Sequence, residues 1–187
     1  FYRKVRDHPP ERDPKGHERL QEARRILLDE ALREEYDAMR RSGGKVKELK
    51  EEAKQVINRE NPNYKAAIKK LKEAVVLAPE LEILRNRLGQ VYFQNDQPQE
   101  ALEQFDRALE LSKDPPAGYF ASRGQALDKL GKLRDSELAL RKAWRRDQGN
   151  YEIARILAQV FHRQDKVEEA LEVLDRAIWA DDKLNFE

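Results

Sequence analysis

A pattern of small and large residues recurs four times along the chain and constrains the fold more than any other feature. Its first members are small residues 34, 35 and 34 positions apart, namely Ala67, Ala101, Ser136 and Ala170. Four positions after each stands a large apolar residue: Leu71, Phe105, Leu140 and Leu174. Three positions further on the residue is always alanine: Ala74, Ala108, Ala143 and Ala177. A period of this length indicates a tandem array of one supersecondary unit.

A second series of small residues, with one member in each unit, lies about one helix upstream of the first: Ala53, Gly89, Gly124 and Ala158. Three positions later come Val56, Tyr92, Leu127 and Phe161. Apolar residues recur at i, i+3, i+4 and i+7, and no segment alternates with the period of a strand, so the pattern predicts an all-α chain. Glycine inside a helix costs about 1 kcal/mol relative to alanine, so we expect Gly89 and Gly124 to allow close helix packing.

The stretch from Leu88 to Ala108 shows this pattern most clearly, with Pro98 at the start of its second helix. The pattern resembles the tetratricopeptide repeat family. The resemblance implies a right-handed superhelical array of antiparallel helix hairpins, whose first helices line a concave groove. We expect the array to span residues 45–187, with repeats near 46–80, 81–115, 116–149 and 150–183. The first hairpin loop, around Asn61-Pro62-Asn63, is about two residues longer than the others.

Residues 1–44 do not follow the repeat. The order of Leu20, Ala23, Leu27, Asp29, Arg33, Tyr36 and Asp37 resembles the last two helices of a J-domain, with Asp29 as an N-cap. A J-domain activates DnaK-type ATPases through a His-Pro-Asp motif, and the matching positions here are His8, Pro9 and Pro10. Proline cannot supply the carboxylate, so we expect no stimulation in an ATPase assay. The segment is either a degenerate J-like docking surface or cap, or an unrelated pair of helices.

Composition excludes several function classes. The chain has 37 Lys and Arg against 36 Asp and Glu, so charge gives no case for nucleic acid as a partner. No apolar run is long enough for membrane insertion. The absence of cysteine excludes disulfides and thiolate metal sites and fits a cytoplasmic protein. Because the chain begins at Phe1 rather than methionine, we expect it to be a fragment.

The sequence contains no recognisable catalytic motif. The three histidines lie far apart, and no phosphate-binding loop, nucleophile elbow or ordered Ser-His-Asp set occurs. We therefore expect a protein that is not an enzyme and that holds neither a cofactor nor a metal.

The groove implied by the family resemblance predicts a partner-binding surface. Its side chains would be Lys50, Lys54, Asn86, Gln90, Phe93, Gln94, Ala121, Gln125, Asp128, Arg155, Gln159 and His162. Gln90, Gln125 and Gln159 occupy one equivalent position in successive repeats. Amides both donate and accept, so such a row could bind the backbone of an extended peptide. The alternative is that these are ordinary solvated polar positions.

Some members of the family hold the C-terminal carboxylate of heat-shock chaperones with a clamp of lysine, asparagine and arginine. Counting from the first repeat, Lys50 fits the clamp, but the residues at the other positions do not: Lys54, Arg87, Gly118 and Ser122. Counting from the second repeat, the mismatches are Asn86, Ser122, Glu152 and Ile156. We therefore expect no carboxylate clamp.

Two tryptophans, Trp144 and Trp179, fall late in the second helices of the third and fourth repeats, where packing against a following hairpin is the favoured role. At the end of the array, Ile178, Trp179 and Phe186 would lack such a cover, which allows self-association.

Three functions remain: a scaffold that binds a partner peptide or helix in the groove, a co-chaperone that retains client or chaperone binding, and a structural protein that assembles through its array ends.

Overall fold

The computed structural model describes residues 13–184, and every regular element among them is a helix. The helices are α2 (Pro14–Leu28), α3 (Glu30–Arg41), α4 (Lys45–Ile57), α5 (Tyr64–Leu77), α6 (Glu82–Gln94), α7 (Pro98–Leu111), α8 (Ala117–Lys129), α9 (Leu133–Arg146), α10 (Tyr151–His162) and α11 (Val167–Leu184). They form two compact units, Phe1–Leu49 and Lys50–Glu187, which divide within α4.

The first unit contains the packed pair α2 and α3. Asp13 caps α2 by accepting a hydrogen bond from the backbone N–H of Gly16 at 2.9 Å, and Asp29 caps α3 through Leu32 at 3.0 Å. The predicted N-cap at Asp29 is therefore confirmed. Tyr36, one of the residues on which the J-domain resemblance rests, is exposed. His8, Pro9 and Pro10 lie outside the described residues.

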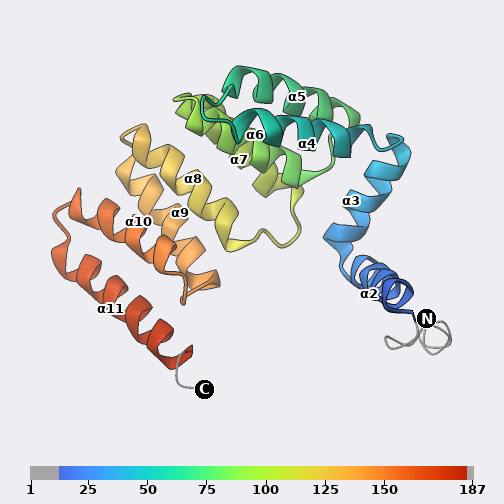
Figure 1. Ribbon diagram of the computed structural model, residues 1–187. Helices are drawn as coiled ribbons and strands as arrows, with labels where there is room; N and C mark the ends of the chain where they lie inside the picture. The colour runs from blue at the N-terminus through green and yellow to red at the C-terminus, as the bar shows by residue number, and fades with distance from the viewer. Residues whose placement is uncertain (1–12, 185–187) are drawn as a thin grey trace. The chain divides into compact units, whose positions relative to one another are not determined.

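The second unit is a row of antiparallel helix hairpins (Figure 1). Helices α6 and α7 form one hairpin, α8 and α9 the next, and α10 and α11 the last. Each second helix also packs on the first helix of the next hairpin: α5 on α6, α7 on α8 and α9 on α10. In addition α6 contacts α8, and α8 contacts α10, so the first helices follow one another along one face of the array.

The core lies where the two helices of a hairpin meet. Of the twenty repeat positions, all are buried except Val56 and Leu174, which are half-buried. A Cβ on Gly89 would lie 2.6 Å from Cε1 of Phe105, and one on Gly124 would lie 2.6 Å from Cγ of Leu140. The steric role expected of these two glycines is therefore confirmed, because a methyl group at either position would overlap the large residue opposite.

The loops of the last three hairpins repeat one backbone conformation. Asp96, Gly131 and Asp165 stand 35 and 34 positions apart, and all three have positive φ, at 60°, 74° and 61°. Aspartate and glycine are among the residues that adopt this left-handed region most readily. The first hairpin differs, since its loop runs from residue 58 to 63, against 95–97 in the second. The longer first loop expected from the sequence is therefore present.

Ion pairs join the last two hairpins. Glu137 on α9 accepts from Lys166 Nζ, just before α11, at 2.6 Å and from Arg141 Nε at 2.8 Å, while its side chain is 13% exposed. Burial acts to raise the pKa of Glu137, but hydrogen bonds from Lys166, Arg141 and Gln164 outweigh it and hold the pKa below its ordinary value of 4.5. The ionised carboxylate thus stabilises the contact between these repeats.

Replacing Glu137 with glutamine is expected to lower the free energy of unfolding by about 1 kcal/mol at neutral pH, since both cationic partners are partly exposed. Because the folded pKa is depressed, this difference should be full above pH 4.5 and shrink as pH falls through the folded pKa. Urea unfolding of both proteins at a series of pH values measures it. A difference that does not change with pH would contradict the assigned role of the charge.

Candidate partner-binding groove

A hollow of about 390 Å³ lies against three successive first helices, α6, α8 and α10. Its lining, hereafter the inner hollow, consists of Asn86, Gln90, Pro116, Gly118, Tyr119, Ala121, Ser122, Gln125, Asn150, Glu152, Ile153 and Ile156. The lining thus combines four amide side chains with apolar side chains such as Tyr119 and Ile156. Apolar walls with a few polar groups of this kind are typical of binding sites for peptides and small molecules.

Asn86 is the most unusual residue of the inner hollow. Its side chain is only 9% exposed, and among the described residues nothing donates a hydrogen bond to its Oδ1 atom. An unsatisfied buried carbonyl costs about 1–3 kcal/mol, so such groups are rare in folded proteins. Because Asn86 also lines the inner hollow, this oxygen is a polar atom near the hollow that still lacks a hydrogen-bond donor.

The charge of the inner hollow comes from a single lining residue, Glu152. Arg155 binds this carboxylate through two nitrogens, at 2.9 and 2.5 Å, one turn further along α10. The hydrogen bonds from Arg155 lower the pKa of Glu152, and Glu152 in turn raises the pKa of Arg155. Both groups remain charged at neutral pH, and their mutual pairing leaves the hollow without a cation of its own.

The structure brings some of the predicted groove residues together and separates others. Asn86, Gln90, Ala121 and Gln125 line the inner hollow, with Arg155 beside it through Glu152. The remaining predicted residues do not line it: Lys50, Lys54, Phe93, Gln94, Asp128, Gln159 and His162. The role of all these residues in partner binding stays a prediction.

Two of the predicted residues that do not line the inner hollow instead form contacts between neighbouring first helices. The ring of Phe93 on α6 lies 5.0 Å from the Nζ atom of Lys129 on α8, and Asp128 on α8 accepts from Arg163 after α10. Gln159 is exposed and lies outside the hollow, although it is equivalent to Gln90 and Gln125. Two of the three equivalent glutamines therefore line the hollow, and the row of three stays a prediction.

Sequence reasoning did not assign several lining residues to the groove, including Tyr119, Asn150 and Ile153. These residues belong to the first turns of α8 and α10 or cap them, whereas the prediction followed the middle of each helix. Ile153 and Ile156 precede Gln159 by about two turns and one turn, so a search for groove residues along one helical face would have included them.

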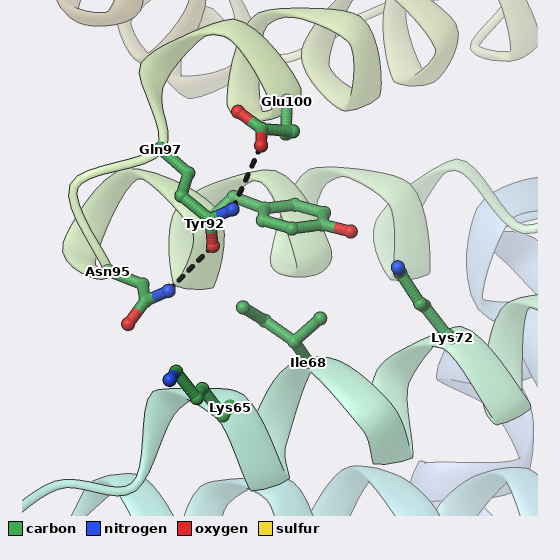
Figure 2. Close-up of a pocket in the computed structure, with 7 residues that line it drawn as sticks. All are labelled: Lys65, Ile68, Lys72, Tyr92, Asn95, Gln97 and Glu100. Atoms are coloured by element: carbon green, nitrogen blue, oxygen red, sulfur yellow. Dashed lines mark hydrogen bonds between the residues drawn. The ribbon is translucent and has the colours of Figure 1, made fainter.

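A second hollow, of about 480 Å³, lies between α5 and the α6–α7 hairpin (Figure 2). Lys72 stands over the ring of Tyr92 at 5.6 Å, beside Ile68. At the rim, Asn95 donates to Gln97 at 2.6 Å, and Gln97 donates to Glu100 at 2.8 Å. These polar side chains satisfy one another and secure the hairpin loop, so we assign this hollow to the interface between repeats.

Within residues 13–184, no cluster of three histidine, aspartate or glutamate side chains is arranged to hold a metal ion. None of the helices described there is both long and apolar enough to cross a bilayer.

The packing of hairpin on hairpin, with first helices along one face, defines an α-helical repeat protein. Family models described as tetratricopeptide repeat match residues 122–184 and residues 84–115. The chain therefore contains tetratricopeptide repeats, which confirms the resemblance for this part of the sequence. Neither match reaches the N-terminal segment, and the J-domain resemblance gains no support from them. Comparison with curated proteins gives no significant match.

Solved structures with a similar fold include MamA, at a TM-score of 0.69 and 20% identity over 81% of this chain and 87% of that one. A MamA fragment from Desulfovibrio magneticus RS-1 gives a TM-score of 0.61 and 20% identity, covering 83% of this chain and 97% of the fragment. The first repeat domain of Spaghetti (RPAP3), bound to the HSP90 peptide SRMEEVD, gives a TM-score of 0.60 and 19% identity. That match covers 65% of this chain and 94% of the RPAP3 chain. These similarities establish the superhelical repeat fold.

Proposed function

We propose that this protein is a non-enzymatic scaffold that binds an extended segment of another protein in the inner hollow. The observation that carries the proposal is the buried, unsatisfied Oδ1 of Asn86, a residue of the hollow that Gln90 and Gln125 also line. Backbone N–H and C=O groups of an extended peptide suit these amides, which both accept and donate. The peptide complex of the RPAP3 repeat domain supports the use of this fold for peptide recognition.

The lining favours a peptide without a terminal carboxylate at this point. Glu152 is its charged member, and the positions that would form a carboxylate clamp hold residues such as Gly118, Ser122 and Ile156. A carboxylate placed here would meet no lysine or arginine among the lining residues, since Arg155 outside the lining is already paired with Glu152. We infer that the preferred ligand is uncharged or basic in the residues that enter the hollow, unlike the acidic peptide SRMEEVD.

The residues that line the inner hollow all come from the repeat array, so we assign the N-terminal segment no role there. His8-Pro9-Pro10 lacks the aspartate of the J-domain motif. We therefore assign no stimulation of a DnaK-type ATPase to the segment, and the function does not require it.

Binding can be tested with extended peptides selected from a random display library against the full chain. Replacing both Gln90 and Gln125 with alanine is expected to lower the affinity for the selected peptides at least about tenfold. Each lost hydrogen bond between uncharged groups costs about 1 kcal/mol. Gln99→Ala is the matched control, because Gln99 is an exposed amide on α7 and lies outside the hollow. Equal affinity for all three proteins in fluorescence anisotropy would refute the proposal, and SRMEEVD should bind none of them.

Asn86→Leu separates a ligand-binding role from a structural one. Removing an unsatisfied buried carbonyl should raise the free energy of unfolding by about 1 kcal/mol, while peptide affinity falls. Urea unfolding and anisotropy on the same variant measure both quantities. A variant that is less stable, or that binds the selected peptide as tightly as the parent, would show that Asn86 supports the fold rather than the ligand.

A further inference from the structure

The middle one of the three helices that line the inner hollow carries unusually small side chains. Helix α8 contacts both α6 and α10, and it lines the hollow with Gly118, Ala121 and Ser122 at the spacing i, i+3 and i+4. The equivalent residues of the neighbouring first helices are all larger: Ile83, Asn86 and Arg87 in α6, and Glu152, Arg155 and Ile156 in α10. A Cβ built on Gly118 would meet no atom within 4 Å. The hollow of about 390 Å³ therefore has room for a long side chain of a bound segment.

Part of the lining is apolar and firmly held. Tyr119, Ile153 and Ile156 line the hollow, although their side chains are buried, with exposed fractions of 8%, 4% and 6%. The two isoleucines also belong to the core cluster that contains Leu157 and Phe161. A fixed apolar surface of this kind suits the methylene stem of a long side chain, which gains free energy by leaving water.

The polar part of the lining favours a cation with several hydrogen-bond donors. Glu152 is exposed, and the lining contains no lysine or arginine. Arg155 donates once to each oxygen of this carboxylate, whereas a carboxylate can accept about four hydrogen bonds. Gln90 and Gln125 add two more carbonyl oxygens to the lining, and Oδ1 of Asn86 lacks a donor. A donor-rich group with a positive charge therefore complements the hollow.

We propose that the inner hollow is a pocket for one arginine side chain of the bound segment. Its guanidinium group donates to Glu152 and to the glutamine oxygens, and its stem lies against Tyr119 and Ile156. This inference rests on the proposed function, because it assigns a specificity to the same groove. It narrows the ligand from an uncharged or basic segment to a segment with an arginine at one position.

Arginine fits this set of partners better than lysine. A guanidinium group is planar and presents five N–H donors in fixed directions, so it can serve a carboxylate and amide oxygens at the same time. The ammonium group of lysine concentrates three donors at one point and is more strongly hydrated. Glu152 already shares its oxygens with Arg155, so a ligand that spreads its donors over several acceptors has the advantage.

The test starts from peptides selected from a random display library against the full chain. An arginine should recur at one position among them. One selected peptide is then synthesised in three forms, with arginine, citrulline or lysine at that position. Citrulline keeps the shape of arginine but carries no charge. Fluorescence anisotropy should show that citrulline lowers the affinity at least about tenfold, with lysine between the two.

Two variants of the protein locate the arginine. Glu152→Gln should lower the affinity for the arginine peptide at least about tenfold and leave the affinity for the citrulline peptide nearly unchanged. Glu168→Gln is the matched control, because Glu168 is also an exposed acid in the first turn of a helix but lies outside the hollow. Gly118→Ile, which introduces the side chain found at the equivalent position of α6, should fill the hollow and weaken the arginine peptide similarly. Circular dichroism checks that this variant folds, which the open space beside Gly118 favours.

The inference is overturned if the arginine and citrulline peptides bind the parent protein equally, or if no arginine recurs among the selected peptides. It is also overturned if Glu152→Gln weakens both peptides alike, which would indicate a structural role, or if Glu168→Gln has the same effect, which would indicate general charge attraction. In each of these cases the proposed function stands as long as replacing Gln90 and Gln125 weakens peptide binding. Loss of that effect, or no peptide binding at all, refutes the proposed function itself.

Discussion

Replacing Phe105 with alanine is expected to lower the free energy of unfolding by about 3–5 kcal/mol, because the ring is 1% exposed and its removal leaves a cavity between α6 and α7. The ring fills the space opposite Gly89, which has no side chain to collapse into the gap. Helix α7 also packs on α8, so the change should weaken the contact between the second and third repeats as well.

Urea unfolding followed by circular dichroism measures this effect, and a thermal scan should show a midpoint lower by roughly 10 °C for a chain of this size. Leu138→Ala is the matched control: it also truncates an apolar side chain in a second helix, but Leu138 is exposed. The control should change the midpoint little. An unchanged midpoint for Phe105→Ala would mean that the repeat register is wrong.

The sequence predicted the hairpins well because one packing rule recurs in every repeat. Positions such as Ala101, Phe105 and Ala108 must fit a neighbouring helix at short range, and this requirement leaves the same residue types at a fixed period. The left-handed residues of the loops, Asp96 and Asp165, follow the same period. Their role was harder to recognise, because aspartate is common in loops of every conformation.

The candidate site was less predictable, because it depends on how successive repeats are rotated against one another. Gln159 shares its repeat position with Gln90 and Gln125, yet it lies outside the inner hollow. The burial of Asn86 has no signature in hydrophobic periodicity, since its side chain is polar. Contacts between repeats, such as Arg123 with Asp106, join residues whose types differ from one interface to the next. Periodicity therefore predicts the unit more reliably than the surface that the units form together.

Gly89→Ala should destabilise the protein by about 1–2 kcal/mol, although alanine is the better helix former by about 1 kcal/mol. The new Cβ would lie 2.6 and 2.7 Å from two ring carbons of Phe105 and 3.1 Å from the backbone oxygen of Ala101. Because the ring is enclosed, it cannot move aside without disturbing the contact with the rest of the repeat. Gly118→Ala is the control, since Gly118 is also helical but a Cβ added there would meet no atom within 4 Å; it should be neutral or stabilising.

The double variant Gly89→Ala/Phe105→Leu tests whether sterics alone determine the choice of glycine. The first and fourth repeats combine alanine with leucine at these two positions, as Ala53 with Leu71 and Ala158 with Leu174. The third repeat instead pairs Gly124 with Leu140, where an added Cβ would also be crowded. When Phe105 has been replaced by leucine, we therefore expect the added methyl group to cost less than it does beside phenylalanine. The resulting double-mutant cycle should give a coupling free energy of roughly 1–2 kcal/mol from urea unfolding. If the two single substitutions change the free energy of unfolding additively, the two residues act independently. Gly89 would then serve a purpose other than making room for the ring.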